Sequence, residues 1–73
     1  MTAPRLNPRK LLLSKWTAVR PSRRERHFLV SRLIFDEGGV LQTVELEAVH
    51  SHRCRQLPWR DLTDTRCWQI GWR

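Results

Sequence analysis

The sequence predicts an all-β fold, and three features of the chain lead to that expectation. Apolar and polar residues alternate along residues 40–49, which is typical of a strand with one buried face and one wet face. Residues 27–35 are almost all apolar, rich in branched and aromatic side chains, and lack the capping residues that begin helices. Gly38 and Gly39 lie between these runs and supply the positive φ angles of a hairpin turn. A long β-hairpin is therefore expected at the centre of the fold.

A first strand is expected before this hairpin, over residues 14–19. Its alternation places Trp16 and Ala18 on one face. Residues 20–26 are interpreted as a polar loop, because they hold four arginines and because Pro21 cannot donate to a sheet ladder.

Three more elements are expected after the hairpin. Residues 52–57 predict a short strand in which Arg53 and Arg55 share one face. Residues 57–62 predict one 3-10 turn, because a proline stands at its first position. Residues 67–72 predict the last strand, with its two tryptophans and its isoleucine on one face.

This order of elements is typical of a small SH3-like five-stranded barrel with a one-turn 3-10 helix before the last strand. An OB-like barrel would usually need more residues and a helix between its third and fourth strands. A three-stranded sheet with a terminal helix is a weaker alternative. We expect residues 1–10 to be a disordered basic tail, since they contain two prolines and almost nothing to bury, and residues 11–73 to form the barrel domain.

The length of the chain limits what it can do. A chain of 73 residues buries only about 60% of its unfolded surface, so large aromatic side chains are the expected compensation. A core of this size is not expected to enclose a small-molecule substrate of about 300 Å³ or more. The sequence contains no targeting segment and no apolar stretch long enough to span a membrane. We expect a cytoplasmic protein with reduced thiols.

The four tryptophans are expected to play different parts. Trp68 is predicted to pack in the core, and Trp16 to be core or half-buried. Trp72, beside the C-terminus, is a candidate to close the end of the barrel. Trp59 follows a proline on an irregular turn between arginines, so it is the best candidate for an exposed ring.

Three tryptophan-containing runs carry a family resemblance. They are KLLLSKWTAV at residues 10–19, LPW at 57–59 and WQIGW at 68–72. Together they resemble a family of short bacterial tryptophan-rich proteins described as conserved hypothetical, over about Asn7 to Trp72. The resemblance implies a bacterial origin and a small stand-alone protein. It brings no assigned activity and no catalytic residues.

A metal site is geometrically conceivable because His50, His52 and Cys54 alternate along a predicted strand and Cys67 follows thirteen residues later. No Cys-x₂-Cys pair is present, and the spacing matches no zinc knuckle. Buried cysteines and rim histidines explain these residues more simply. We expect no metal and no cofactor.

Catalysis is also disfavoured. A cysteine with His27, His50 or His52 could form a nucleophilic pair, oriented by Asp61 or Asp64. The sequence contains no nucleophile motif, phosphate-binding glycine loop or paired-carboxylate signature. We expect a protein that is not an enzyme.

The charge of the chain points to an anionic partner. Fourteen Lys and Arg against seven Asp and Glu give a net charge of +7, and twelve of the fourteen are Arg. Arg grips phosphate with two parallel hydrogen bonds and stacks on bases. The cations gather in residues 1–32 and 53–73, whereas residues 33–52 carry four acids and no Lys or Arg. The simpler alternative is a solvated surface whose loop arginines pair with Glu45, Glu47 or Asp36.

The leading functional hypothesis is a non-catalytic module that binds nucleic acid, RNA in preference to DNA. Its arginines would contact phosphates and Trp59 would provide a stacking face. The candidate site residues are Arg20, Arg23, Arg24, Arg26, Arg53, Arg55, Trp59 and Arg60. The alternative is a protein-interaction module for an acidic partner segment, added at an edge of the barrel.

Overall fold

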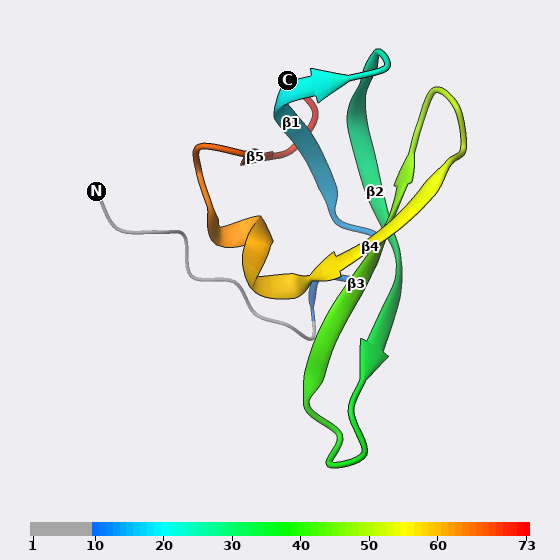
Figure 1. The fold of residues 1–73 in the computed structure, drawn as a ribbon, viewed down its shortest axis with the longest axis vertical. Helices are drawn as coiled ribbons and strands as arrows, with labels where there is room; N and C mark the ends of the chain where they lie inside the picture. Colours follow the sequence, from blue (N-terminus) through cyan, green and yellow to red (C-terminus); the bar gives the residue numbers. More distant parts are fainter. Residues whose placement is uncertain (1–9) are drawn as a thin grey trace.

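Five antiparallel strands and one 3-10 turn make up residues 10–73 of the computed structural model, which is the part of the chain that the structure describes (Figure 1). The expected tail thus lies, apart from Lys10, outside the described residues. The elements are β1 (Lys15–Ser22), β2 (Glu25–Phe35), β3 (Leu41–Ala48), β4 (Cys54–Pro58), the 3-10 turn η2 (Trp59–Thr63) and β5 (Trp68–Ile70).

The strands form one sheet in the order β4-β3-β2-β1-β5, so β4 and β5 lie at its two edges. The all-β prediction is confirmed, together with the five strands and the 3-10 turn before the last one. The two edge strands do not pair with each other, so the sheet is not closed into a barrel.

The predicted central hairpin is present, and a capping carboxylate supports its turn. Asp36 accepts hydrogen bonds from the Val40 amide at 2.9 Å and from the Gln42 side chain at 3.0 Å. The Val40 amide, above all, lowers the pKa of Asp36 below its ordinary value of 3.8. Gly39 provides the positive φ of 80° that closes the turn.

The core lies on one face of the strongly bent sheet. The alternation of β3 buries Val44, Leu46 and Ala48, as the sequence pattern requires. Trp16 on β1 pairs in register with Phe28 on β2, and both are at most 2% exposed. The predictions that Trp16 and Trp68 belong to the core are confirmed. The ring of Trp68 meets Phe28 edge to face at 5.3 Å, a favourable arrangement for two aromatic rings.

The prediction of a basic loop at residues 20–26 is wrong. β1 continues to Ser22 and β2 begins at Glu25, and these two residues pair across a two-residue turn. Pro21 is accommodated because the register of β1 against β2 shifts between Thr17 and Ser22. The arginines of this segment therefore extend from a hairpin rather than from a long loop.

That turn consists of Arg23 and Arg24 alone, with φ angles of 54° and 62°. Positive φ at both central residues is the signature of a type I′ hairpin turn, which usually contains Asn-Gly. An arginine at such a position costs about 1–2 kcal/mol relative to glycine. The tip of the β1–β2 hairpin is therefore strained.

The last strand is shorter than expected, because it ends at Ile70 and Gly71 turns the chain with a φ of 84°. Trp72 then leaves the face of Trp68, contrary to the prediction. Its indole nitrogen donates to the Phe28 carbonyl at 2.9 Å, and its ring stacks on His27 with centroids 6.0 Å apart. This side chain attaches the end of the chain to β2.

The 3-10 turn η2 begins two residues later than predicted. Pro58 stands just before it as the N-cap, with φ −56° and ψ 134°. Leu62 from this turn is completely buried, and this burial holds η2 against the sheet. The turn carries Asp61 to the region between β4 and β5.

Candidate functional site

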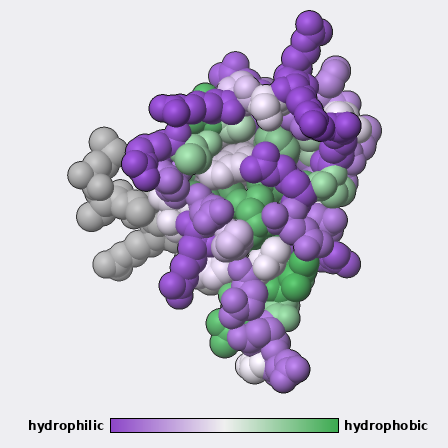
Figure 2. Space-filling view, in the orientation of Figure 1, coloured by the Kyte–Doolittle hydropathy of each residue, from purple (hydrophilic) through white to green (hydrophobic). Residues whose placement is uncertain are grey.

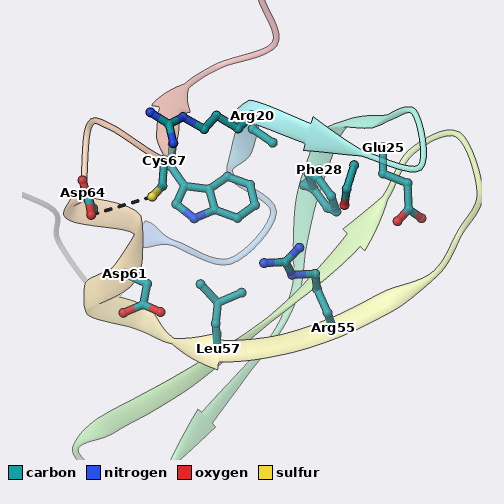
Figure 3. Close-up of a pocket in the computed structure, with 11 residues that line it drawn as sticks. Arg20, Glu25, Phe28, Arg55, Leu57, Asp61, Asp64 and Cys67 are labelled. Carbon is teal, nitrogen blue, oxygen red and sulfur yellow. Dashed lines mark hydrogen bonds between the residues drawn. The ribbon is translucent and has the colours of Figure 1, made fainter.

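An open pocket lies where the sheet fails to close, and we call it the seam pocket (Figure 3). Its volume is about 390 Å³, and it opens to solvent rather than being enclosed. Its apolar lining includes Phe28, Leu57 and Trp68. Its polar lining consists of Arg20, Ser22, Glu25, Arg55, Asp61, Asp64 and Cys67.

Arg55 stands at the centre of the seam pocket because of its register on β4. It pairs with Leu46, a core residue of β3, so its side chain extends from the core-facing side of an edge strand. Its guanidinium lies 5.5 Å from the ring of Trp68 and 5.9 Å from that of Phe28. Inward-pointing charge also protects an edge strand against aggregation. Arg20 extends toward the same pocket from β1, on the opposite side (Figure 3).

A second pocket, of about 350 Å³, adjoins the seam pocket and shares Arg55 and Phe28 with it. Arg23 from the β1–β2 turn and Arg53, which directly precedes β4, complete its basic lining. Four of the predicted site residues therefore surround two neighbouring pockets. We call them the seam arginines: Arg20, Arg23, Arg53 and Arg55.

The other predicted site residues lie elsewhere. Arg24 and Arg26 line a different pocket with His27 and His50. Trp59 and Arg60 line a third one beside the β2–β3 hairpin. The structure therefore divides the predicted site among three places instead of joining it into one.

Trp59 is less available than the sequence suggested. Its side chain is half-buried and packs against the core. The Arg60 guanidinium also lies 5.7 Å from its ring, in cation–π contact. A base would have to displace Arg60 in order to stack on this ring.

The seam arginines have no ion-pair partner within residues 10–73. Among the acids that the sequence suggested as their partners, Asp36 instead caps the central hairpin. The ion pairs of the described chain are Arg32 with Glu45, His52 with Glu47, and Arg66 with Asp64, at 3.1, 3.1 and 3.2 Å. The alternative that the hairpin arginines pair with Glu45, Glu47 or Asp36 is therefore not realised.

The binding site predicted from the sequence did not include the acidic residues of the seam pocket, which are Glu25, Asp61 and Asp64. Glu25 accepts a hydrogen bond from the Ser51 hydroxyl, so it is already engaged. Asp64 accepts from the Arg66 side chain, which lowers the pKa of that carboxyl, and from the Cys67 thiol at 3.7 Å. Asp61 forms no side-chain hydrogen bond within residues 10–73. The lining of the seam pocket thus includes two guanidinium groups and one carboxylate that has no ion-pair partner among the described residues.

In the part of the chain described, the cysteine thiols hydrogen-bond to the His52 carbonyl and the Asp64 carboxylate rather than to a histidine ring. Both Cys54 and Cys67 are free and exposed. Desolvation raises the pKa of the Cys54 thiol, and the Glu45 and Glu47 carboxylates raise it further, which disfavours the thiolate. Residues 10–73 hold no group of three or more His, Cys, Asp or Glu side chains that could bind a metal ion.

The surface around the site is mixed in character. On the face seen in Figure 2, hydrophilic side chains project around a hydrophobic centre. No helix within residues 10–73 has the length and apolar character needed to cross a membrane. Guanidinium groups, a carboxylate and aromatic rings together suit a partner that carries both hydrogen-bond donors and acceptors.

Comparison with known proteins identifies the family. No curated protein and no solved structure matches the chain. The model of a family described as Tryptophan-rich protein (DUF2389) matches residues 14–73, a range that includes all four tryptophans. The resemblance predicted from the three tryptophan-containing runs is confirmed, and the chain belongs to this tryptophan-rich family.

Proposed function

We propose that this protein is a non-catalytic module that binds single-stranded nucleic acid, RNA in preference to DNA. The observation that carries the proposal is the gathering of the four seam arginines around two adjoining pockets, with no ion-pair partner within residues 10–73. Guanidinium groups in such positions bind phosphate oxygens with paired, charge-assisted hydrogen bonds. The nearby carboxylates supply acceptors for the 2′-hydroxyl that distinguishes RNA from DNA.

The strand order supports an SH3-like arrangement as part of this proposal. The order β4-β3-β2-β1-β5, with η2 just before β5, follows the element order of the small SH3-like barrels. In such a fold the ligand groove lies between the β1–β2 connection and the 3-10 turn. The seam pocket occupies the corresponding position, because β1, the start of β2 and η2 all contribute to its lining.

We expect Trp59 to contribute less to RNA binding than the seam arginines do. Because Arg60 covers its ring and the core covers part of its side chain, base stacking there requires a rearrangement. The phosphate contacts of the seam arginines require none, so we assign most of the binding to them.

Paired substitutions test this assignment with a matched control. Arg23→Gln with Arg53→Gln removes two charges from the seam, and Lys10→Gln with Arg32→Gln removes two charges elsewhere. Each exposed contact is worth about 0.7 kcal/mol, so the first pair should weaken binding to labelled single-stranded RNA about tenfold. The control pair should weaken it much less. Equal losses in the two variants would show that net charge, and not the seam, determines binding.

An acidic protein segment is a second candidate partner, and the free edge of β4 favours it. β4 has one neighbour in the sheet, and its other edge lies beside the seam arginines. An extended acidic segment could pair with that edge and place carboxylates near the guanidinium groups. Capture of a defined protein from a nuclease-treated extract, lost in the Arg23→Gln, Arg53→Gln variant, would favour this candidate over RNA.

A further inference from the structure

The acidic residues of the seam pocket show that it is not simply a phosphate site. Glu25, Asp61 and Asp64 all line it, and like charge disfavours a phosphate beside a carboxylate. The adjoining pocket of Arg23 and Arg53 contains only one of these acids, Glu25. Phosphates are therefore better placed at the adjoining pocket, and the seam pocket suits a group that both donates and accepts hydrogen bonds.

Arg55 offers a stacking surface in the seam pocket. One side of its guanidinium faces the rings of Trp68 and Phe28, at 5.5 and 5.9 Å. Those rings are themselves 6% and 1% exposed, so a ligand meets the guanidinium rather than the rings. Unstacked RNA bases stack on arginine planes as well as on aromatic side chains. A base lying on Arg55 would extend the stack outward from the core.

The hydrogen-bonding groups around Arg55 match one base better than the others. Asp61 has no ion-pair partner within residues 10–73, and its two oxygens can accept from two adjacent N–H groups. Guanine carries such a pair, the ring N1–H and the 2-amino group, on its Watson–Crick edge. It also carries acceptors at O6 and N7, the atoms that arginine contacts most often. Arg20 is the second guanidinium of the pocket and is available for them.

We propose that the seam pocket binds one unstacked guanine base of single-stranded RNA. Arg55 stacks on the base, Asp61 accepts hydrogen bonds from its Watson–Crick edge, and Arg20 contacts its acceptor atoms. The flanking phosphates lie at Arg23 and Arg53. This inference rests on the proposed function and adds a base preference to it.

The test uses the full chain and labelled oligouridines of about eight nucleotides, a length in the range of small single-strand binding modules. The oligonucleotides differ only at the central base, which is guanine, inosine, adenine, cytosine or uracil. Guanine is expected to bind more tightly than adenine, cytosine or uracil by about five- to 150-fold, the range of one bidentate base contact. Inosine lacks the 2-amino group and should lose most of that advantage.

Two variants locate the preference in the pocket. Asp61→Ala should abolish the advantage of guanine over uracil at the central position. Glu37→Ala removes the same charge from the exposed β2–β3 turn and should keep the advantage. The comparison of guanine with inosine tests the contact to the 2-amino group without any change to the protein, so the base preference can be refuted even if Asp61→Ala folds poorly.

The outcomes distinguish failure of the guanine pocket from failure of RNA binding as a whole. Salt-dependent binding that is equal for all central bases would overturn the guanine pocket and leave the proposed function standing. A guanine advantage that survives Asp61→Ala would overturn the assignment to this pocket. Failure of every oligonucleotide to bind at low salt would overturn the inference and the proposed function together.

Discussion

The buried hydroxyl of Thr17 is predicted to make the hydrogen bonds that hold the C-terminal residues against the sheet. Thr17 lies on β1 and is only 2% exposed. Its Oγ1 donates to the Gly71 carbonyl at 2.6 Å and accepts from the Arg73 amide at 2.9 Å. Replacement by valine keeps the shape of the side chain and removes both hydrogen bonds. The Gly71 carbonyl and the Arg73 amide would then lose their partner.

A hydrogen bond contributes a net of about 0.5–1.5 kcal/mol, so Thr17→Val, which removes two, should lower the free energy of unfolding by about 2 kcal/mol. For a domain of this size that corresponds to a fall of about 8–16 °C in Tm. Urea unfolding followed by tryptophan fluorescence measures the free energy, and Trp72 should become more exposed because it follows Gly71 directly.

Thr17→Ser is the matched control, since it keeps the hydroxyl and removes one methyl group. Loss of that methyl should cost about 0.8 kcal/mol, less than the loss of the hydroxyl. If Thr17→Val were as stable as the natural chain, or more stable than Thr17→Ser, the hydroxyl would not hold the C-terminal residues and the reasoning would be wrong.

Two further predictions concern the hairpin turns. The pKa of Asp36 is lowered by folding, so its carboxylate stabilises the chain above its ordinary pKa of 3.8, and this contribution disappears as the pH falls through the lower folded-state value. Asp36→Asn should therefore flatten the dependence of Tm on pH between about pH 5 and about pH 2, and an unchanged acid slope would contradict the capping role. Arg23→Asn with Arg24→Gly should raise the free energy of unfolding by about 1–2 kcal/mol, because these residues suit positive φ, and should weaken RNA binding. A variant that gains stability and keeps full RNA affinity would show that Arg23 does not contact the ligand.

The hairpin could be predicted from the sequence because its signals are local. Alternation along residues 40–49 and the apolar run at 27–35 specify two strands, and the glycines between them specify the turn. Residues 20–26 could not be predicted in the same way. Proline and four arginines are typical of a loop, but a register shift accommodates the proline, and Arg23 and Arg24 adopt a turn conformation that usually requires other residues.

The candidate site could be predicted only in part. The arginine content of the sequence was enough to make the seam arginines candidates for binding an anionic partner, because charge can be read directly from the sequence. Their separation from Trp59, and the presence of Asp61 among them, depend on how η2 packs against the sheet through Leu62. No local pattern encodes that packing. One signal was available and was missed, because Gly71 already indicated that the last strand ends before Trp72.

The salt dependence of RNA binding tests the central claim most directly. If Arg23, Arg53 and the neighbouring candidate arginines together neutralise about four phosphates, a plot of log affinity against log salt for single-stranded RNA should have a slope near −3. The measurement needs only the natural chain, a labelled strand and a salt series from about 50 to about 200 mM. A slope close to this value is the predicted result. Affinity that does not change with salt, or no binding at the lowest salt, would contradict the account.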